Sequence, residues 1–428
     1  MSTLAASTIV RLDYGKEGLS LDLAGLNTTV LRPRFISGLP DERASFQGSL
    51  RKPYASRPLR DIVQAHETVS IAIPDITRAL PSDRLLPWLM AELAHVPSEN
   101  VCIVVGTGTH RANTREELVG MVGASVVERY RIVCHDARDK STMRKAGESP
   151  FGYPVYFNKE YAAADRRILM GFIEPHFMAG FSGGYKAVFP GVADLEAILE
   201  YHGYANIAHP RSTWGLLEGN PTQEHVRAGG ALLPVDFLIN VTLNRARAIT
   251  QFFCGHVIVA HEAGCRFSKD TAMAGVEGAF PIVVTTNSGY PLDLNLYQAV
   301  KGMTAAHAIT KPGGLIITAA ECRNGFPDHG AFKQQLLRYA SPSAALQAIS
   351  APDFAEIDQW STQKLHQILL NNRVQLLSVI DQESVRRVHL EPITDVRAAI
   401  DTEIGRLGDP DTTIAVLPEG PLTIPYIK

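Results

Sequence analysis

Short apolar runs alternate with amphipathic segments from about residue 68 onward, and this pattern predicts an α/β fold. Runs rich in Val and Ile predict strands at residues 68–73, 101–105, 131–134, 168–173, 235–239, 248–252, 281–285, 314–318, 374–379 and 412–416. Apolar positions three or four apart predict helices at residues 81–95, 115–122, 257–273, 330–339, 342–349, 361–371 and 393–406. Alternation of apolar and polar residues nearer the start predicts an antiparallel pair, residues 9–14 with 28–32, at a sheet edge.

The strand pattern starts again after residues 275–278, a glycine-containing segment that marks a shift in composition. We therefore expect an N-terminal α/β domain at residues 1–270 and a C-terminal α/β domain at residues 271–428. A chain of 428 residues is also too long for one ordinary hydrophobic core, which agrees with two domains.

The composition, 45% hydrophobic and 20% charged, is that of a globular protein. The net charge of −3 and the absence of a basic patch argue against a nucleic-acid partner. No window approaches the roughly 18 apolar residues of a membrane span, and residues 1–7 do not resemble a targeting sequence, so we expect a cytoplasmic protein. Its five cysteines form no CxxC pair and are expected to be reduced.

Polar side chains follow four predicted strands of the first domain. Asp75 and Arg78 follow the first strand, His110 the second, His135 the third and His176 the fourth. Open α/β sheets bind ligands at the carboxyl ends of their strands, so this repetition predicts one shared site. Either His110 or His176 could act as a base near neutral pH, although each could instead be a capping or core histidine.

A glycine-rich loop, residues 180–186, follows His176 and ends in Lys186. Its glycines allow positive φ and a close approach of the backbone to a ligand, which would bring Lys186 into the site. A tight turn with a solvated lysine is the alternative. The spacing is not that of a Walker A loop, because Ala187 follows the lysine.

The remaining candidates each have a structural alternative. Arg78 could clamp a carboxylate or phosphate and Asp75 could orient a histidine, or the two could form a local cap and a surface ion pair. His202 ends a helical pattern, where the helix dipole favours histidine, so its role could be structural. As a metal ligand it would be solitary, which indicates a metal held by an organic cofactor.

Gln298 and Lys301 are three residues apart and share a helix face, which is either a substrate grip or a solvated surface. Trp360 could stack on a ring or fill the core.

Taken together, these residues resemble the nickel-dependent lactate racemase family. The matching stretches, in order, are Asp75-Ile76-Thr77-Arg78, Gly108-Thr109-His110-Arg111, Glu174-Pro175-His176, the loop from Gly180 to Lys186, His202, Tyr297-Gln298 with Lys301, and Asp358-Gln359-Trp360. They run through the chain from about residue 70 to residue 365.

The resemblance implies two α/β domains with the active site in the cleft between them, and a nickel pincer nucleotide cofactor. A lysine at the position of Lys186 is joined to that cofactor through a thioamide, and a histidine at the position of His202 is the protein ligand of nickel. Residues 75–78 would contact the cofactor. Host enzymes that synthesise the cofactor are implied partners.

The implied activity is a racemase or epimerase of a 2-hydroxy acid such as lactate. His110 would remove the hydroxyl proton from one enantiomer and His176 from the other, while the Cα hydride moves to the cofactor and returns to the opposite face of a 2-keto acid. Arg78, Tyr297, Gln298, Lys301 and Trp360 would contact the substrate. Tyr185 replaces a proline that is frequent in the family, so we expect its phenol to bear on the pocket and on substrate choice.

Two other functions remain open at this level. A nicotinamide-dependent 2-hydroxy-acid dehydrogenase would have a similar fold, but residues 106–110 supply only half of a Gly-x-Gly-x-x-Gly motif. A non-catalytic carrier of the nickel cofactor would need Lys186 and His202 but not the two candidate bases.

Overall fold

The computed structural model describes residues 8–327 and 330–428. These residues form two compact units. The first unit consists of Phe35–His202 and His209–Thr271, and the second of Gly203–Ala208, Ala272–Lys428 and the described part of Met1–Arg34. Both units are α/β, as the sequence predicts.

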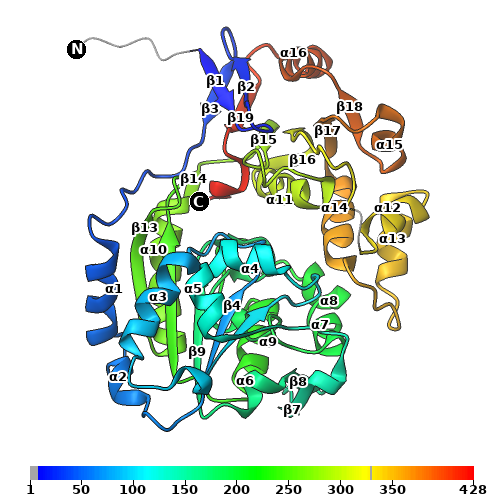
Figure 1. Cartoon of the computed structure of the whole chain (residues 1–428). Coiled ribbons are helices and arrows are strands. Elements are labelled where there is room, and N and C mark those ends of the chain that lie inside the picture. Colours follow the sequence, from blue (N-terminus) through cyan, green and yellow to red (C-terminus); the bar gives the residue numbers. More distant parts are fainter. Residues whose placement is uncertain (1–7, 328–329) are drawn as a thin grey trace. The chain divides into compact units, whose positions relative to one another are not determined.

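The first unit contains a six-stranded sheet in the order β13-β12-β9-β4-β5-β6 (Figure 1). Its strands are β4 (Val69–Pro74), β5 (Val101–Gly106), β6 (Arg131–Cys134), β9 (Arg166–Phe172), β12 (Phe237–Leu243) and β13 (Ile249–Gly255). All neighbouring pairs are parallel except β12 with β13. Two hairpins lie outside the sheet, β7 (Met143–Glu148) with β8 (Pro154–Asn158), and β10 (Pro175–His176) with β11 (Gly180–Phe181).

The order of these strands creates a switch point beside β4. The chain proceeds from β4 through β5 to β6 on one side and then returns to β9 on the other side of β4. Where the chain runs from two adjacent parallel strands in opposite directions, a crevice forms at the carboxyl ends of these strands. Ligands of such sheets bind in this crevice. The ends of β4 and β9 are therefore the expected location of a site.

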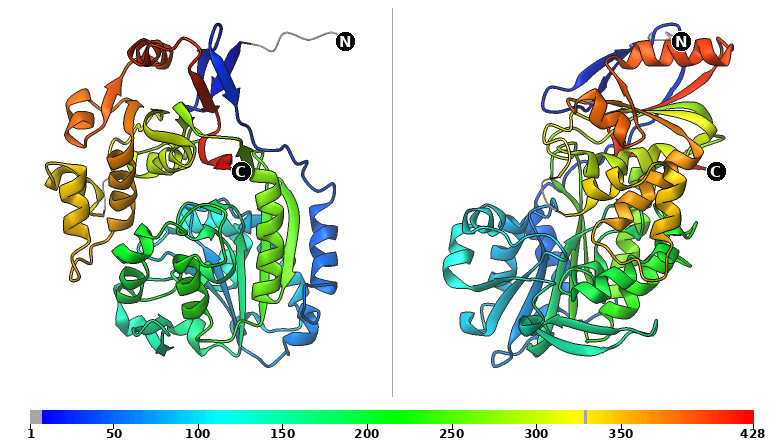
Figure 2. Two further views of the ribbon diagram at one scale, coloured as in Figure 1. Left: turned by 180° about the vertical axis from the view of Figure 1, so that it is seen from behind. Right: turned by 90° about the vertical axis from the view of Figure 1, so that its right-hand side faces the viewer.

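Helices cover both faces of this sheet, and in the right-hand view of Figure 2 the blue and cyan helices lie on one side of the strands and green helices on the other. The helices are α1 (Glu42–Arg51), α2 (Leu59–Ile62), α3 (Ser82–Glu92), α4 (Arg115–Val122), α5 (Ala124–Arg129), α6 (Lys159–Ala163), α7 (Leu195–Tyr201), α9 (Pro221–Gly230) and α10 (Val257–Ala272), with 3-10 turns η1 (Ser98–Asn100), η2 (Lys140–Thr142) and η3 (Gly184–Ala187). Phe46 and Leu89 join Ile71 and Ile103 in one buried cluster. Each such side chain contributes about 1.5–3 kcal/mol by its burial.

The second unit has its own six-stranded sheet, all parallel, in the order β18-β17-β16-β15-β19-β3. Its strands are β3 (Asn27–Val30), β15 (Phe280–Thr286), β16 (Thr310–Ala319), β17 (Arg373–Leu377), β18 (Glu391–Ile393) and β19 (Thr413–Leu417). Two further pairs are β1 (Ile9–Leu12) with β2 (Leu19–Asp22), and β14 (Met273–Val276) with β20 (Ile424–Ile427).

Helices and the β1–β2 hairpin cover the faces of this second sheet. The helices are α8 (Tyr204–Ala208), α11 (Leu296–His307), α12 (Phe332–Arg338), α13 (Pro342–Ile349), α14 (Gln359–Asn371), α15 (Gln382–Arg387) and α16 (Val396–Leu407), with the 3-10 turn η4 (Gly420–Leu422). Met303 and Leu365 pack with Ile316 in one cluster. Leu12 and Ile400 pack with Ile317 in the other.

The predicted pairing of residues 9–14 with residues 28–32 is wrong. Ile9–Leu12 pairs with Leu19–Asp22, whereas Asn27–Val30 lies parallel to β19 at the edge of the second sheet. Alternation along a strand predicts which face is buried but carries no information on a partner from the far end of the chain. The expected first domain, residues 1–270, consequently differs from the first unit, because residues 8–34 and 203–208 belong to the second unit.

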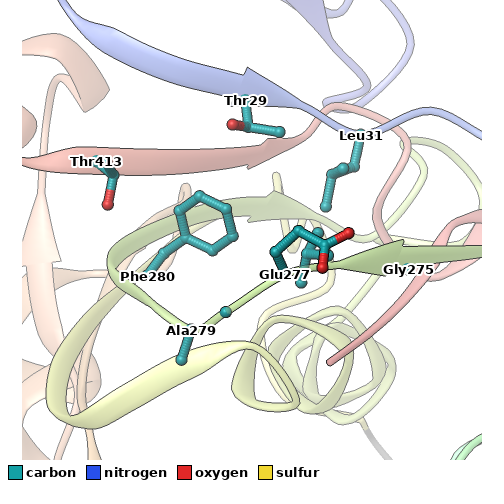
Figure 3. A pocket seen from close by; sticks show the side chains of 9 residues that line it. Thr29, Leu31, Gly275, Glu277, Ala279, Phe280 and Thr413 are labelled. Carbon is teal, nitrogen blue, oxygen red and sulfur yellow. The ribbon is translucent and has the colours of Figure 1, made fainter. Parts of the chain in front are cut away.

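The second unit has a hollow of about 440 Å³ between β3, β19 and the segment from Gly275 to Phe280 (Figure 3). Its carboxylate, Glu277, forms an ion pair with Lys428. None of the predicted site residues lines this hollow. Among the residues described, no helix is both long and apolar enough to cross a bilayer. The N-terminal segment examined for a targeting sequence, residues 1–7, lies outside the described residues.

Candidate active site

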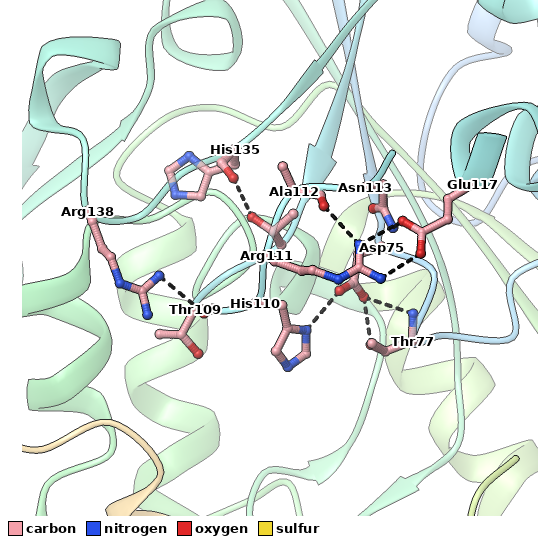
Figure 4. Close-up of polar contacts among 11 residues, drawn as sticks. Asp75, Thr77, Thr109, His110, Arg111, Ala112, Asn113, Glu117, His135 and Arg138 are labelled. Carbon is pink, nitrogen blue, oxygen red and sulfur yellow. Dashed lines mark hydrogen bonds and ion pairs between the residues drawn. The ribbon is translucent and has the colours of Figure 1, made fainter. Parts of the chain in front are cut away.

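Asp75 and His110 form a hydrogen-bonded pair at the carboxyl ends of the adjacent strands β4 and β5 (Figure 4). His110 Nδ1 lies 2.8 Å from Asp75 Oδ2, and Thr77 donates to Asp75 Oδ1 from its hydroxyl at 2.6 Å. Burial of Asp75 alone would raise its pKa, but the hydrogen bonds from His110 and Thr77 and the charge of Arg78 outweigh it and lower that pKa. Asp75 is therefore an ionised acceptor.

The tautomer of His110 follows from this contact. A carboxylate can only accept, so Nδ1 of His110 carries a proton, and the neutral form of the ring has its lone pair on Nε2. The His110 side chain is 41% exposed, whereas the Asp75 side chain is 5% exposed. His110 thus combines a basic nitrogen with a fixed carboxylate partner, which is the arrangement of a general base. Asp75 contacts a histidine as the sequence analysis suggests, and its role in orienting that histidine stays a prediction.

Backbone contacts hold the loop that carries His110. Thr107 Oγ1 donates to the carbonyl of His135 at 2.5 Å, and Gly108 N donates to the carbonyl of Gly191 at 3.0 Å. Arg138 donates to the carbonyl of Thr109 at 3.3 Å. His135 is buried and its Nε2 contacts the carbonyl of Ala193 at 2.8 Å, so this strand-end histidine supports the loop.

His176 lies in the short hairpin of β10 and β11, opposite Gly180. Its Nδ1 accepts hydrogen bonds from the backbone N–H groups of Met178 and Ala179, both at 3.2 Å. The neutral ring must then carry its proton on Nε2. The two candidate bases therefore differ at rest, because His110 has its lone pair on Nε2 and His176 its proton there.

Lys186 follows the glycine-rich loop in η3. Its Nζ lies 3.4 Å from the hydroxyl of Tyr201 and 5.8 Å from the centre of that ring. Burial lowers the pKa of Lys186 to about 7, and the charge of Arg78 adds to the effect. The amine of this partly buried lysine points to Tyr201, which argues against the alternative of a solvated lysine in a tight turn.

Tyr185 packs against α9. A Cβ built at Gly230 of α9 would lie 2.5 Å from the Tyr185 ring, so the ring packs on the backbone of that glycine. Burial raises the pKa of Tyr185, and the nearby charge of Arg227 opposes this. The ring of Tyr185 therefore packs beside α9, and the expected effect of its phenol on substrate choice stays a prediction.

His202 ends α7 and donates from Nδ1 to the carbonyl of Ile198 at 2.9 Å. This contact leaves the lone pair on Nε2, as in histidines that bind metals through Nε2. Burial and the charge of Lys186 lower the pKa of His202 to about 3, so the ring is neutral at ordinary pH. The described residues include no cluster of three or more metal-binding side chains. A metal at His202 would thus take its other donors from a bound molecule.

Arg78 follows β4 and interacts with groups that follow β9 on the other side of the switch point. Its guanidinium lies 3.7 Å from Glu174, which follows β9, in a partly exposed ion pair worth about 0.2–1 kcal/mol. The charge of Arg78 also affects the pKa of Lys186 and of Tyr201. Ile76, in the same loop, has an exposed side chain. The loop of residues 75–78 is therefore close to both the Lys186 amine and the end of β9.

The other predicted site residues lie in the second unit. Lys301 Nζ donates to Gln298 Oε1 at 2.7 Å, which confirms that the two share a face of α11. Trp360 is 5% exposed on α14 and donates from Nε1 to the hydroxyl of Tyr297 at 3.0 Å. Trp360 thus fills the interior while its indole nitrogen fixes Tyr297.

Tyr201 is a site residue that the sequence analysis missed. It is fully buried, and its hydroxyl is the partner of the Lys186 amine. The signal available in the sequence was its position immediately before His202 at the end of a helical pattern.

Comparisons with known proteins agree with this arrangement. The family description "Lactate racemase N-terminal domain" matches residues 14–215, and "Lactate racemase C-terminal domain" matches residues 277–424. The lactate racemase of Thermoanaerobacterium thermosaccharolyticum is 34% identical over 96% of this chain and 97% of its own length. That of Lactiplantibacillus plantarum is 36% identical over 89% of this chain and 90% of its own.

Solved structures give the same result. The lactate racemase apoprotein from T. thermosaccharolyticum superposes with a TM-score of 0.91 at 33% identity, covering 97% of this chain and 99% of that one. A protein from Thermotoga maritima has a TM-score of 0.68 at 18% identity, over 92% of this chain and all of that one, and shares the fold. The family matches, the two curated relatives and the close structural match together show that this chain belongs to the lactate racemase family, a family of isomerases.

Proposed function

We propose that this chain interconverts the two enantiomers of a 2-hydroxy acid, with lactate as the first candidate substrate. The observation that carries the proposal is the Asp75–His110 pair, which provides a fixed base at the switch point of the first sheet. The two curated relatives are both lactate racemases and supply the reaction and the substrate. A non-catalytic carrier would have no need of such a pair.

The residues of the first unit fit a nickel pincer nucleotide. His202 offers one neutral nitrogen, and Lys186 offers a partly buried amine for covalent attachment, while residues 75–78 provide Arg78 for an anionic group. When bound, this cofactor would supply a nickel-centred acceptor for the Cα hydride of the substrate. Enzymes of the host that make the cofactor are then partners of this protein.

His110 takes the hydroxyl proton of one enantiomer at Nε2, and the Asp75 carboxylate stabilises the imidazolium that results. For the other enantiomer we assign the base to His176. Its Nε2 can accept only if its remaining proton moves to Nδ1, so the hydrogen bonds from Met178 and Ala179 must be released in that half of the reaction. Both histidines act on the same substrate oxygen through a planar 2-keto acid.

The substrate carboxylate is assigned to cationic and amide groups. Lys301 and Gln298 present an ammonium and an amide on one face, and Arg78 offers a planar fork that suits a carboxylate. Tyr297 and Trp360 would form the apolar wall, with their mutual hydrogen bond fixing both rings. We place the protein in the cytoplasm and expect neither a nucleic-acid nor a membrane partner.

The proposal is tested by producing the chain together with cofactor-synthesis enzymes and measuring intact mass, nickel content and the loss of optical activity of L-lactate. A mass adduct that is lost in Lys186→Ala, about one nickel per chain and racemisation are expected. His110→Gln should abolish racemisation without removing the adduct. His66→Ala, at the amino end of β4, is the matched control and should keep full activity. A wild-type chain with no adduct and no racemisation of any 2-hydroxy acid would contradict the proposal.

A further inference from the structure

Two buried side chains from other elements hold the glycine-rich loop, residues 180–186. Asn240 of β12 accepts the N–H of Gly184 at Oδ1, at 2.9 Å, and donates from Nδ2 to the carbonyl of Ile239 at 3.0 Å. His261 of α10 lies with Nε2 2.9 Å from the carbonyl of Ser182 and 3.3 Å from the sulfur of Cys265. Asn240 is 1% exposed and His261 2% exposed.

The direction of the His261 contact follows from its environment. Burial lowers the pKa of His261 to about 4, so the ring is neutral at ordinary pH and has one N–H. A carbonyl oxygen can only accept, so this N–H is on Nε2 and donates to Ser182. The loop therefore accepts a hydrogen bond from His261 at the Ser182 carbonyl and donates one to Asn240 from the Gly184 amide.

Glycines occur where the loop meets these side chains. Gly183 has φ of 82°, and a Cβ there would lie 2.6 Å from Asn240 Oδ1. Gly184 has φ of 56°, and a Cβ there would lie 2.8 Å from Cγ of His261. Both contacts are shorter than side chains tolerate. With Asn240 and His261 behind it, the loop can therefore take this path only with glycine at both positions.

The direction of Lys186 depends on this path. Lys186 N donates to the carbonyl of Gly183 at 3.1 Å, which starts η3 directly after the two held residues. Ser182 Oγ donates to the carbonyl of Phe172 at 2.9 Å and accepts from the N–H of Glu174 at 3.0 Å, which ties the loop to the end of β9. A shift of Ser182 or Gly184 would thus be passed to the Lys186 amine.

We propose that Asn240 and His261 are positioning residues, which hold the glycine-rich loop in the conformation that presents the Lys186 amine for attachment of the cofactor. The proposal rests on the proposed function for the attachment itself. The preformed shape of the loop is a property of the protein before any cofactor arrives. A loop fixed in advance avoids the ordering cost that a mobile lysine would incur on attachment.

The test uses the full chain without cofactor, followed by the chain produced with the cofactor-synthesis enzymes. Asn240→Leu removes the acceptor for Gly184, and His261→Phe removes the donor to Ser182, each at similar volume. His261→Gln keeps an N–H donor and is the rescue variant. His225→Phe is the matched control, because His225 is a buried histidine of the same unit that bonds to Tyr153 and stacks on Phe151.

Hydrogen exchange of peptides covering residues 180–186 is the first readout. We expect Asn240→Leu and His261→Phe to raise exchange of these amides about tenfold or more, with His261→Gln near wild type and His225→Phe unchanged in this segment. The fraction of chains with the cofactor mass should fall at least severalfold in the same two variants. Asn240→Ser replaces Asn240→Leu if the latter does not fold.

Exchange in residues 180–186 that is no faster in the two variants than in His225→Phe would overturn the proposal. Loading of the variants equal to wild type would overturn it as well. If the wild-type chain itself gains no adduct, the proposed function fails, while the exchange measurement still decides whether Asn240 and His261 hold the loop. The two failures are therefore distinguishable.

Discussion

Histidine chemistry in the first unit is set residue by residue through the partner of Nδ1. Asp75 accepts from His110, two backbone N–H groups donate to His176, and a helix carbonyl accepts from His202. As a result His110 has a basic Nε2, His176 has a proton on Nε2, and His202 has an Nε2 lone pair suited to a metal. These assignments depend on atoms brought together by folding, so residue type and spacing alone cannot supply them.

Removing the charge of Asp75 tests the first of these partners. Asp75→Asn keeps the size of the side chain but no longer stabilises an imidazolium at His110, so we expect the racemisation rate constant to fall about 100-fold. The rate with each enantiomer of lactate and the melting temperature should be measured together. A loss of less than twofold in rate, in a variant that folds normally, would contradict the role given to Asp75.

The tautomer of His176 can be observed directly. Nitrogen NMR of the imidazoles in the chain without cofactor should show an unprotonated Nδ1 and a protonated Nε2 for His176, and the reverse pattern for His110. His110→Gln and His176→Gln assign the signals. An unprotonated Nε2 on both rings would contradict the assignment for His176.

His366 provides a prediction on stability. It is fully buried on α14, and neither ring nitrogen has a hydrogen-bond partner among the residues described. Burial, together with His389 nearby, lowers the pKa of His366 to about 4. In the unfolded protein His366 binds a proton as the pH falls below about 6.5, whereas in the folded protein it does so only near pH 4. The contribution of the neutral His366 to the free energy of unfolding is therefore complete above pH 6.5 and is lost toward pH 4.

His366→Leu should therefore stabilise the protein by about 1 kcal/mol at pH 7, because an unsatisfied buried polar group is removed. The difference in melting temperature from wild type should widen between pH 7 and pH 5. His66→Ala, an exposed histidine, is the control and should show no such trend. A lower melting temperature for His366→Leu at pH 5 would be the contrary result.

At the scale of elements, the sequence predicts best where local signals are complete. Helix α4 has the predicted bounds, residues 115–122, because Thr114 and Glu117 form a capping box and Gly123 ends it. Most parallel strands are also placed within a few residues, since buried strands are continuous apolar runs. The short parallel strand β18 was not predicted, and β3 was predicted with the wrong partner. The hairpin of β7 and β8 was not predicted because β7 is polar and largely exposed. Helix α9 was not predicted because the residues that it buries are mostly polar or glycine, so it has no apolar period.

The hairpin of β10 and β11 depends on one glycine. Gly180 has φ of 77°, and a Cβ there would lie 1.9 Å from the carbonyl oxygen of Leu216. Gly180→Ala should therefore destabilise the protein by several kcal/mol, more than the roughly 1 kcal/mol of a glycine that is merely strained.

Urea unfolding would measure the effect of Gly180→Ala. Gly120→Ala is the control, because Gly120 lies inside α4 with open space around it, and it should raise stability by up to about 1 kcal/mol. Equal effects of the two substitutions would show that the contact with Leu216 does not constrain the hairpin.

At the scale of the whole molecule, each unit has a six-stranded sheet with one switch point, and the two switch points differ. In the second sheet the chain passes from β15 through β16, β17 and β18 and returns to β19 on the other side of β15. That switch point is closed, because Ser288 donates to the carbonyl of Glu419 at 2.6 Å and a Cβ at Gly420 would lie 2.2 Å from the carbonyl oxygen of Thr286. The corresponding point of the first sheet instead carries Asp75, Arg78 and Glu174.

Deleting the N-terminal residues tests how far the second unit depends on them. A chain starting at residue 35 loses β3 and leaves β19 as an exposed edge strand, and it loses the apolar contacts of Leu12 and Leu21. We expect it to melt at a lower temperature and to aggregate, with the first unit retained in limited proteolysis. Unchanged melting of the second unit would contradict this expectation.

The pairing of β3 with β19 has a consequence for synthesis on the ribosome. The strand made among the first thirty or so residues has its partner at Thr413–Leu417, close to the end of the chain. Domains generally fold as their residues emerge, so the first unit can be complete while the second still lacks an edge of its sheet. β3 must therefore wait until Thr413–Leu417 has been made, and a chaperone that shields it during this time would raise the yield of folded protein.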